Sequence, residues 1–466
     1  MNATSLTLLQ ALRLSSTSAI ALVGAGGKTT ALYQIGREYR QGKPLVLLTT
    51  STHLGYDQVL AAEFHLVVHR GSVEETLRRL PSDQGLICLT ADWDNQTQRW
   101  RGLDPEMLQM VARYAHERSI PLIVEADGAR GRSLKAPAEH EPALPSFCDP
   151  ILVVAGLAAL GRPLSEEWVH RPQRFAELSG LRLDETISIE AVQRVLSHPL
   201  GGRKNIPTTA KSHVLLTQAE MPEAQAAAKK LSLSLLERFD SVIVASKGQP
   251  FRPSTAVDFR HPYRILAAYE PVAGVVLAAG ASSRFGQPKP LLAWQGETLV
   301  HRAARLALEA GLRPVLVVCG AEGDRVAAAV ADLPVQVVWN TAWESGQSTS
   351  IRAAVQALGE KTGATLFLLV DQPFVSTRLL QSLVETHAQT LAPVIAPQVG
   401  GQRGNPVLFD RSTFPDLLRL EGDVGGRGIF ARYPLQWLPW QDERLLFDLD
   451  TPEDYQRLLQ MDAEDA

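Results

Sequence analysis

Short apolar runs alternate with amphipathic stretches along the whole chain of 466 residues. Its first part contains AIALVG, PLVLLTT, HLVV, LICLT, PLIVE, ILVVAG, HVLLT and SVIVAS, and its second part contains VAGVVLAA, PVLVVC, VQVVW, TLFLLV and APVIAP. Runs this short and this rich in β-branched residues predict buried strands, and the stretches between them predict helices. The pattern therefore predicts an α/β fold in which helices wrap parallel sheets.

The strand–loop–helix pattern starts twice, which predicts two domains. The length agrees, because a domain usually holds about 100–200 residues. We expect the domains to cover residues 1–265 and 272–466. Their junction is expected near residues 258–272, where no long Gly/Ser or Pro linker occurs.

Composition narrows the class of protein. The chain is 45% hydrophobic and 21% charged, with a formal net charge of -4 and no basic stripe, so nucleic acid is not an expected partner. Cys88, Cys148 and Cys319 are widely scattered, which argues against a disulfide framework or a zinc site. No run of 18 apolar residues predicts a membrane span, and we expect a cytoplasmic protein.

The stretch VGAGGKTT, residues 23–30, follows the first apolar run and resembles a phosphate loop. It nearly fits GxxxxGK[ST], although Leu22 stands where the first glycine would be. Backbone N–H groups at a helix N-terminus cradle phosphate, Lys28 would reach the outer phosphates, and Thr29 would reach Mg²⁺. The alternative is a purely structural loop. The predicted nucleotide-binding residues are Gly24, Gly26, Gly27, Lys28, Thr29 and Thr30.

A second element of this site is predicted in PLIVEADGARGRSLKAP. Asp127 follows an apolar run, as a carboxylate that holds Mg²⁺ through water would, although a turn aspartate is the alternative. Arg130, Arg132 and Lys135 form either an anion contact or a solvated face. The run TQAE, residues 217–220, is a poor copy of a base-reading NKxD motif, so either ATP or GTP would fit.

Four motifs resemble the selenium-dependent hydroxylase accessory protein family: VGAGGKTT, TTSTHLG, VEADGARGRSLKAPAEHEP and AGLAALGRPL. The resemblance covers about residues 10–265. It implies a place in molybdenum hydroxylase maturation, with a client hydroxylase of the xanthine dehydrogenase kind as partner. His53 and His140 lie within these motifs, and both a structural and a direct role stay open.

The stretch LAAGASSRFGQPK, residues 277–289, predicts a second phosphate loop of a different kind. It lacks GK[ST], but a glycine turn after a strand, followed by Arg284 and Lys289, suits a transferase that holds NTP for attack at the α-phosphate. Arg284 and Lys289 are predicted to offset charge in catalysis. The predicted nucleotide-binding residues here are Leu277, Ala278, Ala279, Gly280, Arg284 and Lys289.

Acidic and polar residues further along complete this prediction. Asp371 ends an apolar strand, and Asp448 and Asp450 alternate in LLFDLD, where a short strand would point both to one face. All three are predicted to hold Mg²⁺, with Asp371 and Asp450 also counted as catalytic. A polar loop with Asn340, Gly346 and Ser348 is expected to bind the base or ribose, or else to cap a helix.

From about residue 272 onward the chain resembles the MobA-like NTP transferase family. The resemblance rests on LAAGASSRFGQPKPLL, WNTAWESGQSTSI, DQPFV, GNPVLF, GDVGGRGIF and DLDTPEDY. It implies a Rossmann-like nucleotidyltransferase fold beside the P-loop-like first domain. LAAG, where the guanylyltransferase branch usually has LAGG, favours transfer of CMP from Mg-CTP to Mo-molybdopterin. The alternatives are a transferase using GTP or a sugar phosphate, or a non-catalytic carrier of the cofactor.

Overall fold

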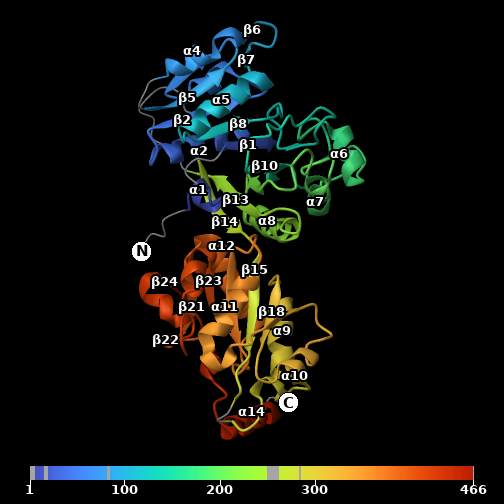
Figure 1. The fold of residues 1–466 in the computed structure, drawn as a ribbon. Coiled ribbons are helices and arrows are strands. Elements are labelled where there is room, and N and C mark those ends of the chain that lie inside the picture. The colour runs from blue at the N-terminus through green and yellow to red at the C-terminus, as the bar shows by residue number, and fades with distance from the viewer. Residues whose placement is uncertain (1–5, 15–18, 81–83, 249–261, 283–284, 465–466) are drawn as a thin grey trace. The chain divides into compact units, whose positions relative to one another are not determined.

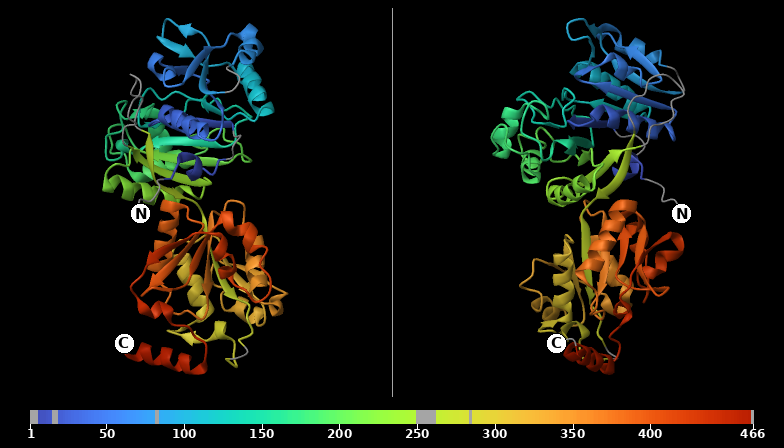
Figure 2. Two further views of the ribbon diagram at one scale, coloured as in Figure 1. Left: turned by 90° about the vertical axis from the view of Figure 1, so that its left-hand side faces the viewer. Right: turned by 180° about the vertical axis from the view of Figure 1, so that it is seen from behind.

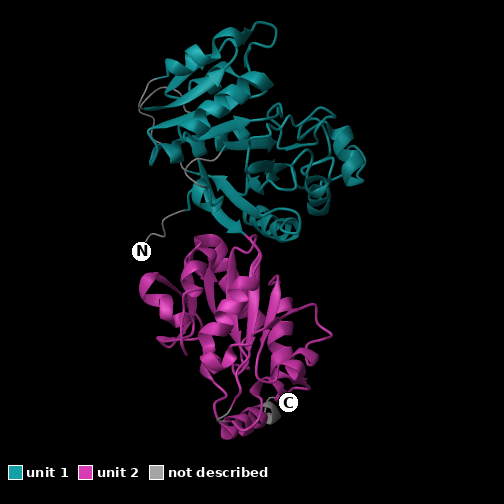
Figure 3. Ribbon diagram, in the orientation of Figure 1, with its two compact units in different colours: residues 1–269 teal, residues 270–466 magenta. Residues whose placement is uncertain are grey.

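The computed structural model describes residues 6–14, 19–80, 84–248, 262–282 and 285–464. Contacts within the chain divide it into two compact units, Met1–Tyr269 and Glu270–Ala466 (Figure 3). Each unit has its own sheet with helices packed along it (Figures 1 and 2). The α/β class predicted from the apolar runs is confirmed for both units.

The sheet of the first unit has nine strands, one for each predicted apolar run plus an added edge strand. In spatial order they are β14 (Tyr263–Tyr269), β13 (Ser241–Lys247), β12 (Ser212–Thr217), β10 (Ile151–Gly156), β1 (Ala19–Gly24), β8 (Leu122–Glu125), β2 (Leu45–Thr50), β5 (Gly85–Thr90) and β4 (Phe64–Val67). Neighbours pair in parallel, except that β14 runs antiparallel to β13. Strands β2, β5, β10 and β12 are buried along their whole length, as parallel strands covered on both faces should be.

Two of the longer helices of the first unit begin at a side chain that caps them. Asp104 accepts a hydrogen bond from the Met107 N–H at the start of α5, and Ser188 does the same for Ala191 in α7. The helices are α1 (Leu8–Ala11), α2 (Lys28–Arg40), α3 (Tyr56–Val59), α4 (Val73–Arg78), α5 (Pro105–Glu117), α6 (Pro172–Ser179), α7 (Ile189–Ser197) and α8 (Pro222–Leu235). Two small sheets accompany them: β3 (His53–Leu54) with β7 (Arg99–Arg101) and β6 (Trp93–Asp94), and β9 (Leu134–Lys135) with β11 (Val169–His170).

The second unit contains a mixed sheet. In spatial order its strands are β19 (Gln336–Trp339), β18 (Val315–Cys319), β15 (Val272–Ala278), β20 (Ala364–Leu369), β23 (Val407–Asp410), β21 (Val394–Val399) and β22 (Gln402–Arg403), with β24 (Leu435–Pro439) beside β21. The first four pair in parallel, whereas β23 runs antiparallel to both β20 and β21. The larger helices are α9 (Leu299–Glu309), α10 (Gly323–Ala328), α11 (Gln347–Ala357), α12 (Thr377–Thr390) and α14 (Pro452–Glu464).

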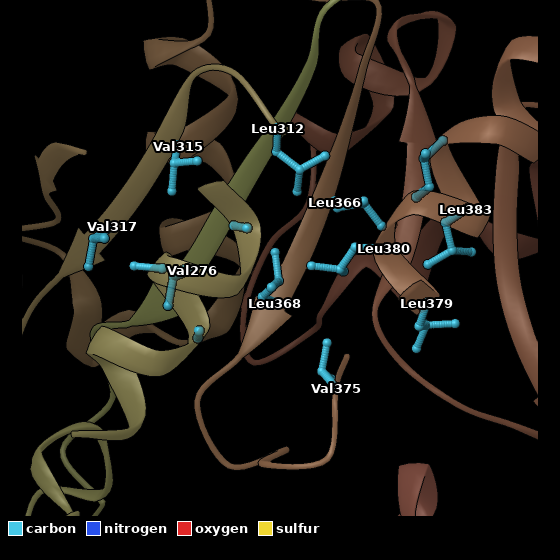
Figure 4. Packing of buried hydrophobic residues seen from close by; sticks show 14 of the residues in the cluster. Val276, Leu312, Val315, Val317, Leu366, Leu368, Val375, Leu379, Leu380 and Leu383 are labelled. Atoms are coloured by element: carbon cyan, nitrogen blue, oxygen red, sulfur yellow. The ribbon is translucent and has the colours of Figure 1, made fainter. Parts of the chain in front are cut away.

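Successive residues of the central strands of this unit feed two different cores. Val276 and Val317 pack in one core with the helices α9, α10 and α12, whereas Val275 and Val318 pack in another with α11. Figure 4 shows the first core, in which Leu366 and Leu368 of β20 approach Leu380 of α12. The two-residue period of a strand explains this division, because neighbouring side chains point to opposite faces of the sheet.

The three cysteines are all buried and free, as their scatter in the sequence suggests. Burial raises the pKa of the Cys88 thiol to about 12 and that of Cys319 to about 11. Among the residues that the structure describes, no helix is both long enough and apolar enough to cross a membrane.

A buried histidine on β12 should make the first unit sensitive to acid. Burial lowers the pKa of His213 to about 4, and the ring nitrogen Nδ1 lies 2.7 Å from the Ser241 hydroxyl. In the unfolded chain this histidine is protonated below about pH 6.5, whereas in the folded chain it stays neutral down to about pH 4. The free energy of unfolding therefore falls between pH 6.5 and pH 4, by on the order of 3 kcal/mol. We expect His213→Asn to lose less stability than the native chain in urea unfolding at pH 7.5 and 4.5. His116→Asn, at an exposed histidine, is the control, and equal acid losses in all three proteins would contradict the prediction.

Candidate functional site

The first glycine loop joins β1 to α2 in a conformation that needs glycine. Gly24, Gly26 and Gly27 have φ of 94°, 82° and 122°. A Cβ at Gly24 would lie 2.2 Å from the Val154 carbonyl oxygen, so the close approach of β10 also excludes a side chain. The Tyr263 hydroxyl donates to the Gly27 carbonyl at 3.0 Å and holds the far side of the loop.

Lys28 begins α2 and is almost fully buried. Its Nζ donates to the Gly24 carbonyl at 2.6 Å and lies 3.2 Å from Asp127 Oδ1 and 3.9 Å from Glu125 Oε1. Beside it, the Thr29 hydroxyl donates to Glu125 Oε2 at 3.0 Å. The loop therefore places a cation and a hydroxyl against the two carboxylates at the end of β8.

The two carboxylates differ in their surroundings. Asp127 is 2% exposed and accepts the Gly24 N–H at 3.1 Å, while Lys28 and Lys135 contact its two oxygens at 3.2 and 2.8 Å. Glu125 instead lines an open cavity together with Thr29. The geometry thus favours Glu125 as the carboxylate that faces a ligand, although the sequence singled out Asp127. The signal was the Glu-x-Asp pair itself, but the sequence could not tell which member would be enclosed.

An open cavity of about 1600 Å³ lies over the loop. Of the predicted residues, Gly26, Gly27, Lys28, Thr29 and Thr30 line it, whereas Gly24 and Asp127 lie beneath it. His53, His140 and Gln218 also line it, but Glu220, the last residue of TQAE, does not. Its cationic lining residues are Lys28, Arg99, Arg130, Arg132, Arg171 and Lys247, and its acidic ones are Asp57, Glu125 and Glu141. This excess of positive charge suits an anionic ligand.

The second loop follows β15, on which Leu277 and Ala278 lie, and Ala279 packs in the core beside α11. Gly280 is exposed, and a Cβ built there would meet no atom within 4 Å. Arg284, predicted to act with Lys289, lies outside the described residues. The Lys289 N–H donates to the Ser282 hydroxyl at 3.1 Å, so the loop folds back on itself before the 3₁₀ turn η3 (Lys289–Leu291).

Lys289 lies between two of the predicted carboxylates. Its Nζ is 3.2 Å from Asp450 Oδ1 and 3.7 Å from Asp371 Oδ2. Burial raises the pKa of Asp371 above its ordinary value, and the charge of Lys289 opposes this shift. Asp371 Oδ1 is buried and has no hydrogen-bond partner among the described residues. The structure therefore brings Lys289, Asp371 and Asp450 together.

The prediction that Asp448 and Asp450 share a strand is wrong. After the 3₁₀ turn η7 (Glu443–Leu446), residues 447–450 form no ladder, and the Leu449 N–H donates instead to the Asp371 carbonyl at 2.9 Å. Asp448 accepts from the Gln372 amide at 2.8 Å, whereas Asp450 extends to Lys289. Asp448 therefore braces the segment that carries Asp371.

The polar loop before α11 is largely self-contained. The Asn340 amide nitrogen donates to the Thr349 and Ser350 hydroxyls at 2.8 and 2.9 Å, and its oxygen accepts the Ala342 N–H. Gly346 precedes α11 with φ of 109°, and the buried Ser348 hydroxyl has no partner among the described residues. Asn340 is thus placed to hold the start of the helix rather than to meet a base.

Each unit is thus an α/β domain. Within each one, a glycine loop lies close to carboxylates near the carboxyl ends of parallel strands. Residues 274–437 match the MobA-like NTP transferase domain, and residues 20–173 match the YqeC protein family. The chain belongs to these two families, joined in one polypeptide, so the second unit is a nucleotidyltransferase-type domain.

Three relatives illustrate the range of names in these families. Protein YqeC of Escherichia coli (strain K12) is 32% identical over 188 residues, which cover 40% of this chain and 71% of that protein. Nicotine blue oxidoreductase of Paenarthrobacter nicotinovorans is 34% identical, with 40% and 96% covered. Molybdenum cofactor cytidylyltransferase of Escherichia coli (strain K12) is 23% identical, with 39% and 92% covered. Because the names of these relatives differ so much, they do not identify the substrate of this chain.

The position of Lys289 predicts opposite effects of two substitutions on Mn²⁺ binding. Asp371→Asn should weaken binding about tenfold or more, because it removes an anionic ligand atom. Lys289→Met should strengthen it, because the competing ammonium leaves. Calorimetric titration with Mn²⁺ measures both, with Asp324→Asn at an exposed residue of α10 as the control. Weaker binding in Lys289→Met would contradict the assignment.

Proposed function

We propose that the second unit is a molybdenum cofactor cytidylyltransferase. It transfers CMP from Mg-CTP to the terminal phosphate of Mo-molybdopterin and releases pyrophosphate. The observation that carries the proposal is the meeting of Lys289, Asp371 and Asp450 beside the glycine loop after β15. One cation for the triphosphate and two carboxylates for a metal are what nucleotidyl transfer requires of a protein.

The loop after β15 supplies room and charge for the triphosphate. Gly280 is exposed, and the space where a side chain would stand is open, so phosphate oxygens have access to the backbone there. The Lys289 side chain is 15% exposed and within reach of a ligand once it leaves the carboxylates. Arg284 is proposed to add a second cation to this loop.

The carboxylates fit a divalent cation. Asp371 Oδ1 is a buried oxygen without a partner among the described residues, and Asp450 is 75% exposed, so one ligand is fixed and the other accessible. We propose that Asp371 and Asp450 would hold Mg²⁺, with Asp448 bracing the segment. The bound ion would neutralise charge on the phosphate oxygens.

The proposed transfer of CMP needs few further groups from the protein. An oxygen of the acceptor phosphate monoester attacks the α-phosphorus of CTP, a new P–O bond forms, and the bond to the β-phosphate oxygen breaks. Because the attacking monoester is already an anion, no side chain needs to remove a proton. Lys289 offsets charge on the leaving pyrophosphate. The LAAG form of the loop and the resemblance to a cytidylyltransferase support CTP as the donor.

Pyrophosphate release with Mg²⁺, Mo-molybdopterin and each of the four NTPs tests this function. We expect release with CTP alone. Lys289→Ala and Asp450→Ala should each lower the rate about 100-fold or more, because each removes charge stabilisation from the transition state. Asp324→Ala should leave it unchanged.

Two other outcomes would change the proposal. Selective release with GTP would retain the reaction but replace the donor. Measurable CTP binding without release from any NTP would replace the transferase by a non-catalytic carrier of the cofactor.

We also propose that the first unit binds ATP or GTP at the loop of residues 24–30. Lys28 would contact the outer phosphates, and Thr29 with Glu125, rather than Asp127, would hold Mg²⁺. Gln218 follows β12, Lys247 ends β13, and both line the same cavity, where they would meet the base. Binding there would serve hand-over of the finished cofactor to a client molybdenum hydroxylase.

Lys28→Ala should weaken nucleotide binding to the first unit about tenfold or more, because the phosphates lose their buried cation. Equilibrium titration with fluorescent ATP and GTP analogues measures this. The titration uses the full chain carrying Lys289→Ala, so that the second unit contributes little. Lys211→Ala, at an exposed lysine before β12, is the matched control. An unchanged nucleotide affinity in Lys28→Ala would contradict the proposal that the nucleotide binds at this loop.

A further inference from the structure

A second group of cationic and imidazole side chains lines the cavity of the first unit. Its members come from two stretches of the chain, one between β8 and β10 and the other at the end of β11. They are Arg130, Arg132, His140, His170 and Arg171, called here the arginine–histidine wall. The proposed nucleotide contacts use none of these residues.

Arg171 is held in a fixed orientation within this wall. Its guanidinium donates from Nη1 to Glu141 Oε2 at 2.7 Å and from Nη2 to Oε1 at 3.2 Å, a two-pronged contact. Its backbone lies in the left-handed region, with φ of 65° and ψ of 66°. A residue held there by its surroundings is more common at functional sites than elsewhere.

Buried ion pairs connect Arg171 to the glycine loop. Glu141 Oε2 lies 2.8 Å from Lys135 Nζ, and Lys135 lies 2.8 Å from Asp127. Asp127 in turn contacts Lys28 at 3.2 Å. The side chains of Lys135 and Asp127 are 1% and 2% exposed. Charges this deeply buried lose much hydration energy, so the chain of pairs is better explained by positioning than by stability.

The charge states in the wall are clear from its contacts. Arg171 and Lys135 hold the pKa of Glu141 at about 2 against its burial, so this carboxyl stays ionised and keeps Arg171 in place. Burial lowers the pKa of His170 to about 4, so its ring is neutral near pH 7 and able to donate one hydrogen bond. Arg130 and Arg132 are exposed, and in the described part of the chain neither pairs with an acid.

The cavity is larger than one ligand needs. Ligand pockets usually measure about 300–1,000 Å³, whereas this cavity measures about 1600 Å³. The nucleotide contacts proposed at the loop, Gln218 and Lys247 include no side chain of the arginine–histidine wall. Arginine forks and neutral imidazole N–H groups are suited to the oxygens of a phosphate.

We propose that the arginine–histidine wall binds the phosphate group of a second, phosphorylated small molecule while a nucleotide occupies the glycine loop. The inference rests on the proposed nucleotide site of the first unit and adds a second ligand of stated chemistry to it. The first unit would then hold two anions in one cavity, each with its own cations. Asp127, Lys135 and Glu141 fix the geometry between them.

Inorganic phosphate is the probe, titrated calorimetrically into the full chain in the presence of saturating ATP or GTP. We expect phosphate to bind the nucleotide-loaded protein, and Arg130→Ala/Arg132→Ala to weaken its binding at least tenfold with nucleotide affinity unchanged. Arg171→Lys should weaken phosphate binding as well, because an ammonium cannot make the two-pronged contact with Glu141 that holds the side chain in place. Arg113→Ala, at an exposed arginine of α5, should have no effect.

The two proposals fail in different ways. Competition between phosphate and nucleotide in the native chain, or no phosphate binding at all, would overturn the second subsite. Equal phosphate affinity in the native chain and in Arg130→Ala/Arg132→Ala would also overturn the second subsite. Both side chains are exposed, so this variant is expected to fold normally. In Lys28→Ala we expect the opposite pattern: nucleotide binding is lost and phosphate binding is retained. Unchanged nucleotide binding there would overturn only the nucleotide site.

Discussion

Parallel strands that run in one direction end at one edge of their sheet, and both candidate sites depend on this constraint. The Gly24 N–H donates to Asp127, which lies 103 residues away, because β1 and β8 are neighbours that end side by side. Lys289 meets Asp450, 161 residues further along, because the segment before α14 is tied to the end of β20 at Asp371. The side chains that come together therefore lie near the ends of strands or in segments tied to those ends, whatever their separation in the sequence.

In the first unit, one buried carboxylate organises this edge. Asp127 satisfies the Gly24 N–H and separates two lysines that would otherwise repel each other in a medium of low dielectric constant. Its loss would take the shared counter-ion from two buried cations and leave Lys135 with Glu141 and Lys28 with Glu125 at 3.9 Å, which costs more than the pairs themselves contribute. The carboxylate that looks like a metal ligand in the sequence is thus an internal counter-ion, and its neighbour Glu125 is left to face the cavity.

Much of the fold could be predicted from the sequence, because buried parallel strands leave short apolar runs that few other structures share. Each predicted run is a strand in the structure. The antiparallel strands β14 and β23 could not be predicted, since strand direction depends on pairing partners rather than on local pattern.

The sites were predicted less completely, for a related reason. Lys289, Asp371 and Asp450 could be grouped because each lies in a stretch with recognisable neighbours, LAAGASSRFGQPK, DQPFV and DLDTPEDY. Asn340 was expected to bind the base or ribose or to cap a helix, and the sequence did not reveal that hydroxyls nine and ten residues away on α11 use its amide. Glu141 lies within one of the quoted motifs but received no role from it, and Arg171 lies outside all of them. Only the tertiary structure joins Arg171 through Glu141 to Lys135.

The burial of all three cysteines has a practical consequence for spectroscopy. Thiols that ionise only far above neutral pH and lie within the core react slowly with maleimides, since the thiolate is the reactive form. A single cysteine introduced at an exposed position such as Gly280 would then be the preferred site for a fluorescent or spin label, with the native cysteines left in place. A pair of such labels, one at each loop of the same molecule, would allow the distance between the two loops to be followed in solution.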